Sequence, residues 1–140
     1  MTIENEIKYD LCDTQGFLYI EAYKQGYNIE NFHNRFMNSE TCKNYFDTNY
    51  SRLQLADAYE CLDFLLPEIK TDLYFGANNF SAEIAEWIGF IFRLLYIETK
   101  ISSRELCKII SFTDMLAYYP GLHTIETTNA IDIIKKDYNL

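Results

Sequence analysis

The sequence predicts an all-α protein folded as a compact bundle of six or seven helices, and two observations lead to this class. Apolar residues recur at spacings of three and four along most of the chain, and no segment alternates convincingly as a strand does. Residues 84–97 are apolar on nearly all sides, which is typical of the buried middle helix of a bundle, so we place a central helix near residues 82–99. With 140 residues and no Pro-, Gly- or Ser-rich linker, the chain is expected to form one helical domain over residues 1–140.

The first part of the chain is predicted to form three helices. A helix over residues 4–25 carries an apolar stripe and ends at Gly26, although Gly16 lies inside it and could interrupt it. Asn28 is placed to cap a second helix, and Ser39 to cap a short third one.

A fourth helix begins near Leu55 and is expected to end at Pro67, because proline disfavours helical geometry in the residue before it. Its polar face carries Asp57, Glu60 and Asp63. Carboxylates at this spacing can hold a divalent cation, and a solvated helix face is the simpler explanation. The acidic part of the chain therefore begins on a helix surface.

The second half of the chain is predicted to form the remaining helices. Residues 71–80 predict a loop, after which Ser81 can cap the central helix. Ser102–Glu105 is a capping box, S-x-x-E, that opens the next helix. A short helical piece is then expected to stop at residues 118–121, where Tyr-Tyr-Pro-Gly predicts a turn, and a last helix covers about residues 128–138.

Acidic residues outnumber basic ones, 21 to 12, and the net charge is −9 at neutral pH. Basic surfaces bind nucleic acids and anionic membranes, so we expect neither as a partner. The imbalance is concentrated in residues 53–92, where seven acids accompany a single base, Lys70. Such a segment suits a basic protein partner or could mimic the charge of a nucleic acid, and a solvated surface is the alternative.

The sequence gives no sign of export or of a membrane anchor. Met1–Glu4 lacks the basic start of a signal peptide, and no stretch reaches the roughly 18 uncharged apolar residues of a membrane span. Four cysteines without C-x-x-C or C-x-x-H spacing argue against a zinc site and suit core positions. We therefore expect a cytoplasmic protein with reduced thiols and without a metal or cofactor.

Three residues stand out as candidates for chemistry. Arg93 lies within the apolar central segment with no carboxylate three or four residues away, so its partner is expected from another helix. It forms either a structural ion pair or an anchor exposed in an interface. His123 follows a Pro-Gly pair and could act as a general base, or its ring could hydrogen-bond the turn. His33 lies among polar residues and is expected at the surface.

Aromatic residues are abundant, with 12 tyrosines and 10 phenylalanines. Several lie near predicted helix ends or loops, where some must be partly exposed: Tyr45, Phe46, Tyr50, Tyr74, Phe75, Tyr118 and Tyr119. Large rigid side chains with a hydroxyl group are well suited to protein recognition, although core filling is the alternative for each of them.

Several short motifs resemble those of a known family. They are Trp87–Arg93, Ser102–Leu106, Tyr119–Thr124 and Ala130–Asp132, supported by Asp13–Leu18 and Phe36–Ser39. The chain resembles a family of small, acidic, uncharacterised bacterial proteins found in operons with a predicted ADP-ribosyltransferase-like toxin. The resemblance implies an antitoxin-like or accessory role with a toxin-like enzyme as the partner, and it carries over no catalytic residue. Before the last helix, where the family has aspartate and then proline, this chain has Glu126 and Thr127.

These observations lead to three hypotheses of function. The first is a protein-interaction module that binds and neutralises, or assists, a partner encoded nearby, and a homo-oligomer is compatible with it. Its candidate contact residues are Asp57, Glu60, Asp63, Arg93, Tyr118, Tyr119 and His123. The second is an acidic nucleic-acid mimic of the kind that mobile elements use as inhibitors. The third is a small enzyme using His123 and Arg93, which requires both side chains in one pocket.

Overall fold

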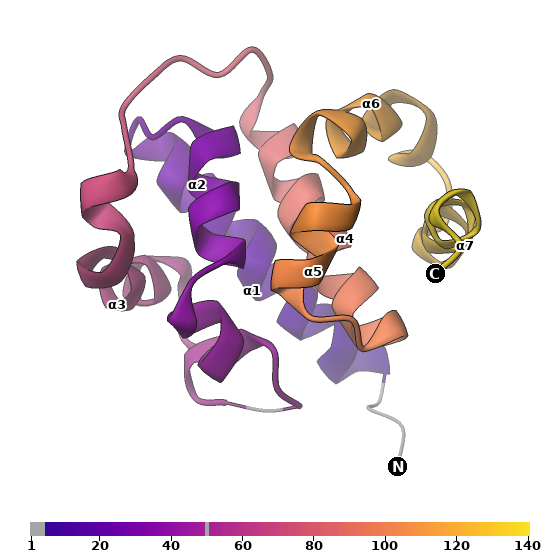
Figure 1. Cartoon of the computed structure of the whole chain (residues 1–140), viewed down its shortest axis with the longest axis horizontal. Coiled ribbons are helices and arrows are strands. Elements are labelled where there is room, and N and C mark those ends of the chain that lie inside the picture. Colours follow the sequence, from indigo (N-terminus) through magenta and orange to yellow (C-terminus); the bar gives the residue numbers. More distant parts are fainter. Residues whose placement is uncertain (1–4, 50) are drawn as a thin grey trace.

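The computed structural model describes residues 5–49 and 51–140, so the predicted helix start at Glu4 and the predicted exposure of Tyr50 lie outside the described residues. The described residues form seven α-helices: α1 (Asn5–Lys24), α2 (Ile29–Met37), α3 (Ala58–Ile69), α4 (Ala82–Thr99), α5 (Ser103–Ile109), α6 (Phe112–Leu122) and α7 (Thr127–Tyr138). Helices α1 and α4 pack along each other in the middle of the molecule, with α2 and α3 to one side and α5, α6 and α7 to the other (Figure 1).

The all-α class and the central helix are confirmed. Helix α4 spans Ala82–Thr99, and its middle, from Ile91 to Leu95, is buried at every position. An isolated β-bridge joins Tyr27 to Phe75, and the described residues otherwise contain no strand pairing. Within the part of the chain that the structure describes, no helix combines the length and apolar character needed to cross a bilayer.

Several predicted helix ends are confirmed by their hydrogen bonds. The Asn28 side chain accepts the N–H of Asn31 at 3.0 Å, and the Ser102 hydroxyl accepts the N–H of Glu105 at 3.2 Å. Gly26 follows α1 with a φ of +91°, a conformation that favours glycine. The predicted short third helix is a π-helical turn, Cys42–Phe46, which Ser39 caps through a 2.9 Å bond from the N–H of Cys42.

The predicted stops at Pro67 and at residues 118–121 are wrong. Pro67 lies inside α3, which continues to Ile69, and Pro120 lies inside α6, which continues to Leu122. A proline in a helix removes one backbone hydrogen bond and costs about 3 kcal/mol in a helix interior. Both prolines lie in the last turn, and the helix beyond each of them places a buried side chain, Ile69 or Leu122, against the core. That burial offsets the local cost.

The predicted surface position of His33 is also wrong. The ring is fully buried, and its Nδ1 lies 2.6 Å from the Tyr19 hydroxyl. The rings of Phe92 and Phe112 lie 4.5 and 5.4 Å away, centre to centre. Phe46, one of the helix-end aromatics of which only some were expected to be exposed, is buried and fills the core. Polar neighbours in sequence misled the prediction, because residues that are adjacent along a helix point in different directions.

Glycines on α1 and α4 let these two helices approach closely. Gly16, which does not interrupt α1, lies against Glu86 of α4. Gly89 lies on α4, and a Cβ atom there would come within 2.9 Å of the Gln15 carbonyl oxygen and 3.0 Å of the Tyr19 ring. Helices α1 and α4 therefore approach each other closely at Gly89.

Replacing Gly89 by alanine is expected to lower the free energy of unfolding by about 1–3 kcal/mol, because the added methyl group forces backbone apart at the main helix contact. Gly121→Ala is the matched control. Nothing lies within 4 Å of a Cβ there, so the better helix propensity of alanine is expected to stabilise α6 by up to about 1 kcal/mol. Urea denaturation of both variants measures the difference, and equal effects would contradict this account of the α1–α4 contact.

Candidate functional site

The outer face of α3 combines acidic and aromatic side chains, and we call Tyr59, Glu60, Asp63, Phe64 and Pro67 the α3 face. All five are exposed, and Tyr59 and Phe64 are 63% and 49% accessible. At about 100° per residue, the two carboxylates and the proline fall between the two aromatic rings around the helix axis. The opposite side of α3 is buried in the core. The helix therefore presents carboxylates flanked by apolar surface to solvent.

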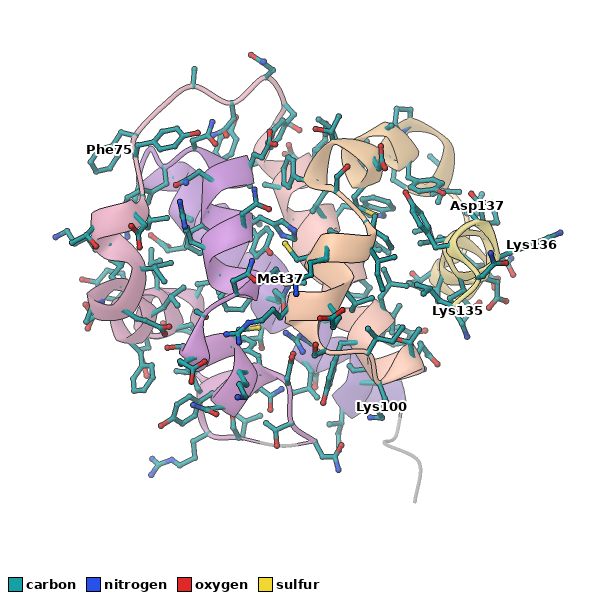
Figure 2. All side chains as sticks on the ribbon, in the orientation of Figure 1. Met37, Phe75, Lys100, Lys135, Lys136 and Asp137 are labelled. Carbon is teal, nitrogen blue, oxygen red and sulfur yellow. The ribbon has the colours of Figure 1, made fainter. Side chains whose placement is uncertain are left out.

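More exposed apolar side chains lie before α3 in the chain and in the loop after it. Tyr45 packs edge-on against Phe64, with ring centres 5.1 Å apart, and is itself 40% exposed. Leu55, just before α3, is 59% exposed. Farther along the chain, Phe75 stacks on Tyr27 at 4.7 Å and projects outward from the loop between α3 and α4 (Figure 2). The predicted exposure of some loop and helix-end aromatics is confirmed at Tyr45, Tyr74 and Phe75.

Two acids of the acidic segment serve the fold. Asp57 is the N-cap of α3, and its Oδ1 accepts the N–H of Glu60 at 2.9 Å. Glu68 accepts the backbone N–H groups of Glu40 and Thr41, at 2.6 and 2.9 Å, and the Thr41 hydroxyl. Burial works to raise the pKa of Glu68, but these hydrogen bonds outweigh it and lower the pKa. Glu60 and Asp63 make no side-chain contact of this kind in the described residues and remain available to a partner.

Arg93 is buried in the core, with 1% of its surface exposed. The guanidinium donates to the Gln15 Oε1 (2.7 Å), the Phe46 carbonyl (3.0 Å), the Asp47 Oδ1 (2.8 Å) and the Ser103 hydroxyl (3.0 Å). Asp47 in turn accepts the Ser103 N–H at 2.8 Å. The predicted partner from another element is thus Asp47, which follows the π-helical turn. Arg93 ties α1, the π-helical turn and the start of α5 to α4, so its role is structural and it is not an exposed interface anchor.

A cavity of about 330 Å³ lies between α4, α6 and α7. It is lined by Glu83, Glu86, Trp87, Phe90, Ile91, Tyr119, Leu122, His123, Ile125, Thr127 and Ala130. Two of the predicted contact residues, Tyr119 and His123, therefore meet here. Tyr119 lies in the last turn of α6, which continues through Pro120, and His123 follows that helix as its C-cap residue.

Aromatic rings form one side of this cavity. The Tyr119 ring meets Trp87 edge-on at 5.5 Å and stacks on His123 at 4.1 Å with an angle of 8°. The His123 Nδ1 lies 2.7 Å from the Tyr119 carbonyl oxygen. Because a carbonyl oxygen only accepts, Nδ1 carries the proton and the neutral ring presents Nε2 as an acceptor. The expected hydrogen bond of His123 to the chain segment before it is confirmed.

Two carboxylates border the cavity without a basic partner. Glu83 lies in the first turn of α4, and Glu86 lies one turn later, half-buried. Burial raises the pKa of Glu86, and repulsion from Asp13 and Glu83 raises it further. Among the described residues, neither glutamate takes part in an ion pair. The cavity is consequently a region of unbalanced negative charge.

The remaining predicted site residues do not form one centre. The Tyr118 hydroxyl donates to Asp137 of α7 at 2.5 Å, and burial together with this carboxylate raises the pKa of Tyr118. Arg93 does not line the cavity that contains His123. The two residues also have no hydrogen-bond partner in common. The pairing that the enzyme hypothesis requires is therefore not formed.

The described residues offer no metal site, and three of the cysteines are buried and unsuited to thiol chemistry. Within residues 5–49 and 51–140, no group of three or more histidine, cysteine, aspartate or glutamate side chains is arranged to hold a metal ion. Burial raises the pKa of Cys12 and Cys61 to about 12 and that of Cys42 to about 11. These thiols are protonated at neutral pH, as expected of core residues.

The sequence reasoning missed Tyr59 and Phe64 on α3, and Trp87, Glu83 and Glu86 in the cavity. The α3 face could have been predicted from helical spacing, because residues 59, 60, 63, 64 and 67 share one face of a helix whose other face is apolar. The cavity depends on how three helices meet, which no local pattern encodes. No protein-family model, curated protein or solved structure compared with the chain matches it.

Proposed function

We propose that this chain is a cytoplasmic protein-interaction module of the antitoxin-like or accessory kind, and that it binds a basic partner protein through the α3 face. The observation that carries the proposal is the composition of this face: Glu60 and Asp63 lie between the exposed rings of Tyr59 and Phe64. Burying aromatic side chains supplies most of the energy at protein interfaces, and charged groups around them select the partner.

Charge complementarity supports a basic partner. The chain carries a net charge of −9, and residues 53–92 contribute −6 of it. Lys70, the single base of that segment, lies at the C-terminal end of α3. A partner with a basic surface would be attracted electrostatically by residues 53–92, and it would associate faster at low ionic strength. The toxin-like enzyme implied by the family resemblance is the partner we propose to test first.

The alternative of a nucleic-acid mimic gains no comparable support. A mimic needs a continuous row of available carboxylates. Here Asp57 and Glu68 are hydrogen-bonded within the fold, while Glu60 and Asp63 lie on α3 and Glu83 and Glu86 on α4. Asp72, which is exposed, lies in the short 3₁₀ turn after α3, so the available carboxylates of the acidic segment are divided among α3, this turn and α4.

The test is co-expression of the tagged chain with each product of the two flanking genes, followed by measurement of the dissociation constant. The double variant Glu60→Lys/Asp63→Lys is expected to weaken the complex at least about 100-fold, because two attractive charges become repulsive at the interface. Phe64→Ala is expected to cost about 1–2 kcal/mol of binding free energy.

The matched control is Asp132→Lys, an exposed acid on α7, on the opposite side of the molecule from α3 (Figure 1). It changes the net charge in the same direction and is expected to weaken binding less than about threefold. If neither flanking product binds, or if the α3 double variant binds as tightly as Asp132→Lys, the proposal is wrong.

A further inference from the structure

We propose that the cavity between α4, α6 and α7 is a binding site for a small organic ammonium ion. The site lies apart from the α3 face, and the inference stands independently of the proposed partner protein. It rests on three properties of the cavity: its size, its aromatic lining and its unbalanced negative charge.

The size of the cavity sets the size of the ligand. At about 330 Å³ it lies at the lower end of the range of roughly 300–1,000 Å³ that small-molecule sites occupy. Ile91, Leu122 and Ala130 give it an apolar floor, and all three are buried in the core. A ligand with a compact aliphatic body of a few carbon atoms therefore fits.

The aromatic lining is suited to a cation. Trp87, Phe90 and Tyr119 line the cavity together with the His123 ring. The edge-on contact of Trp87 with Tyr119, at 5.5 Å, sets the planes of these two rings at 84° to each other. Tyr119 also stacks on His123 at 4.1 Å, so these rings form a cluster at the cavity, and the electron-rich faces of aromatic rings attract alkylammonium groups.

The charge of the lining has the complementary sign. The charged residues that line the cavity are Glu83 and Glu86, and neither lysine nor arginine is among the described residues of the lining. Asp13, on α1, adds to the negative potential at Glu86. Burial and then repulsion from Asp13 and Glu83 raise the pKa of Glu86, and an ammonium ion bound beside it would offset the repulsion. The negative potential of the cavity therefore repels anions and attracts a cation.

The experiment uses choline as the probe and 3,3-dimethylbutan-1-ol as its neutral counterpart, in which carbon replaces the charged nitrogen. Trp87 is the single tryptophan of the chain and lines the cavity, so its fluorescence reports occupancy directly. At constant ionic strength we expect saturable binding of choline with a dissociation constant of about 0.1–1 mM, and at least about fivefold weaker binding of the neutral alcohol.

Glu86→Gln is the principal variant, because it removes the charge, keeps the shape and leaves Trp87 in place. It is expected to weaken choline binding at least about fivefold without loss of helicity by circular dichroism. Asp132→Asn, an exposed acid outside the cavity, is the matched control and is expected to bind choline as the native chain does.

Three outcomes would overturn the inference. They are no saturable fluorescence change with choline up to about 20 mM, equal affinity for the neutral alcohol, and full affinity in a folded Glu86→Gln variant. Loss of partner binding in the α3 double variant leaves this result untouched, so the two proposals fail separately.

Discussion

Replacing Arg93 by methionine is expected to lower the free energy of unfolding by about 3–5 kcal/mol, a larger loss than the one expected for Gly89→Ala. The variant keeps the volume of the side chain but leaves the Asp47 carboxylate, which is 10% exposed, without its cation. The Gln15 amide oxygen also loses its donor, whereas the Phe46 carbonyl keeps the hydrogen bond from the Gln54 amide at 3.0 Å. Urea denaturation at neutral pH, followed by circular dichroism, measures the loss.

The matched control is Lys108→Met, which removes a cation from an exposed pair with Glu105. Exposed pairs contribute little, so this variant is expected to stay within about 0.5 kcal/mol of the native chain. A second check is Asp47→Asn combined with Arg93→Met, where the double variant should lose much less stability than the sum of the two single losses. If Arg93→Met costs less than about 1 kcal/mol, the buried network does not hold these helices together.

The stability of the protein is expected to fall steeply as the pH drops from 7 to 5, because His33 is buried without a charged partner. Burial lowers the pKa of His33 to about 3, while the unfolded chain titrates near the ordinary value of 6.5. The unfolded state therefore binds more protons below pH 6.5. The stabilisation is fully present above pH 6.5 and is lost as the pH falls toward 3, by about 2 kcal/mol between pH 7 and 5.

The hydrogen bonding of His33 explains why it stays neutral. Burial raises the pKa of Tyr19 well above its ordinary value, so its hydroxyl keeps its proton and donates to the His33 Nδ1 at 2.6 Å. The ring N–H is then Nε2, which faces the Cys107 Sγ at 4.0 Å. Protonation would put a second hydrogen between Nδ1 and the hydroxyl oxygen. The charged ring would also have no carboxylate among its hydrogen-bond partners.

His33→Leu and His123→Leu form the test pair for this prediction. The first removes the buried ring and should make stability nearly independent of pH between 7 and 5, although it lowers stability at pH 7 because Tyr19 loses its acceptor. The second removes an exposed ring and should leave the pH dependence in place. If the His33 ring protons titrate near pH 6.5 by NMR in the folded protein, the prediction fails.

Local patterns were sufficient to predict the helices and the side-chain caps Asn28 and Ser102. The side chains of Asn28 and Ser102 accept hydrogen bonds from N–H groups three residues later, so each cap and its donor lie close together in sequence. The predicted Ser81 lies at the N-cap position of α4 without a side-chain cap hydrogen bond, and the caps Asp57 of α3 and Ser111 of α6 were not predicted. The partner of Arg93 was predictable in kind, because a buried guanidinium requires acceptors from elsewhere in the fold. Its identity was not, since Asp47 lies 46 residues away.

The errors have a common physical origin in tertiary packing. Pro67 and Pro120 carry local signals against helix, but burial of the residues beyond them outweighs those signals. His33 lies among polar residues in sequence and still faces the core with Phe32 and Phe36. The cavity needs α4, α6 and α7 together, and its carboxylates come from a helix otherwise notable for its apolar character.

The most direct test of the interaction-module proposal is to map the binding surface by NMR. The isotope-labelled chain would be titrated with the unlabelled basic product of a flanking gene, and amide shifts would be followed. We predict that the largest changes fall on residues 59–67 and on Tyr45, which packs against Phe64. Changes confined to α6 and α7, or no changes at partner concentrations that saturate the complex, would contradict the assignment of the α3 face.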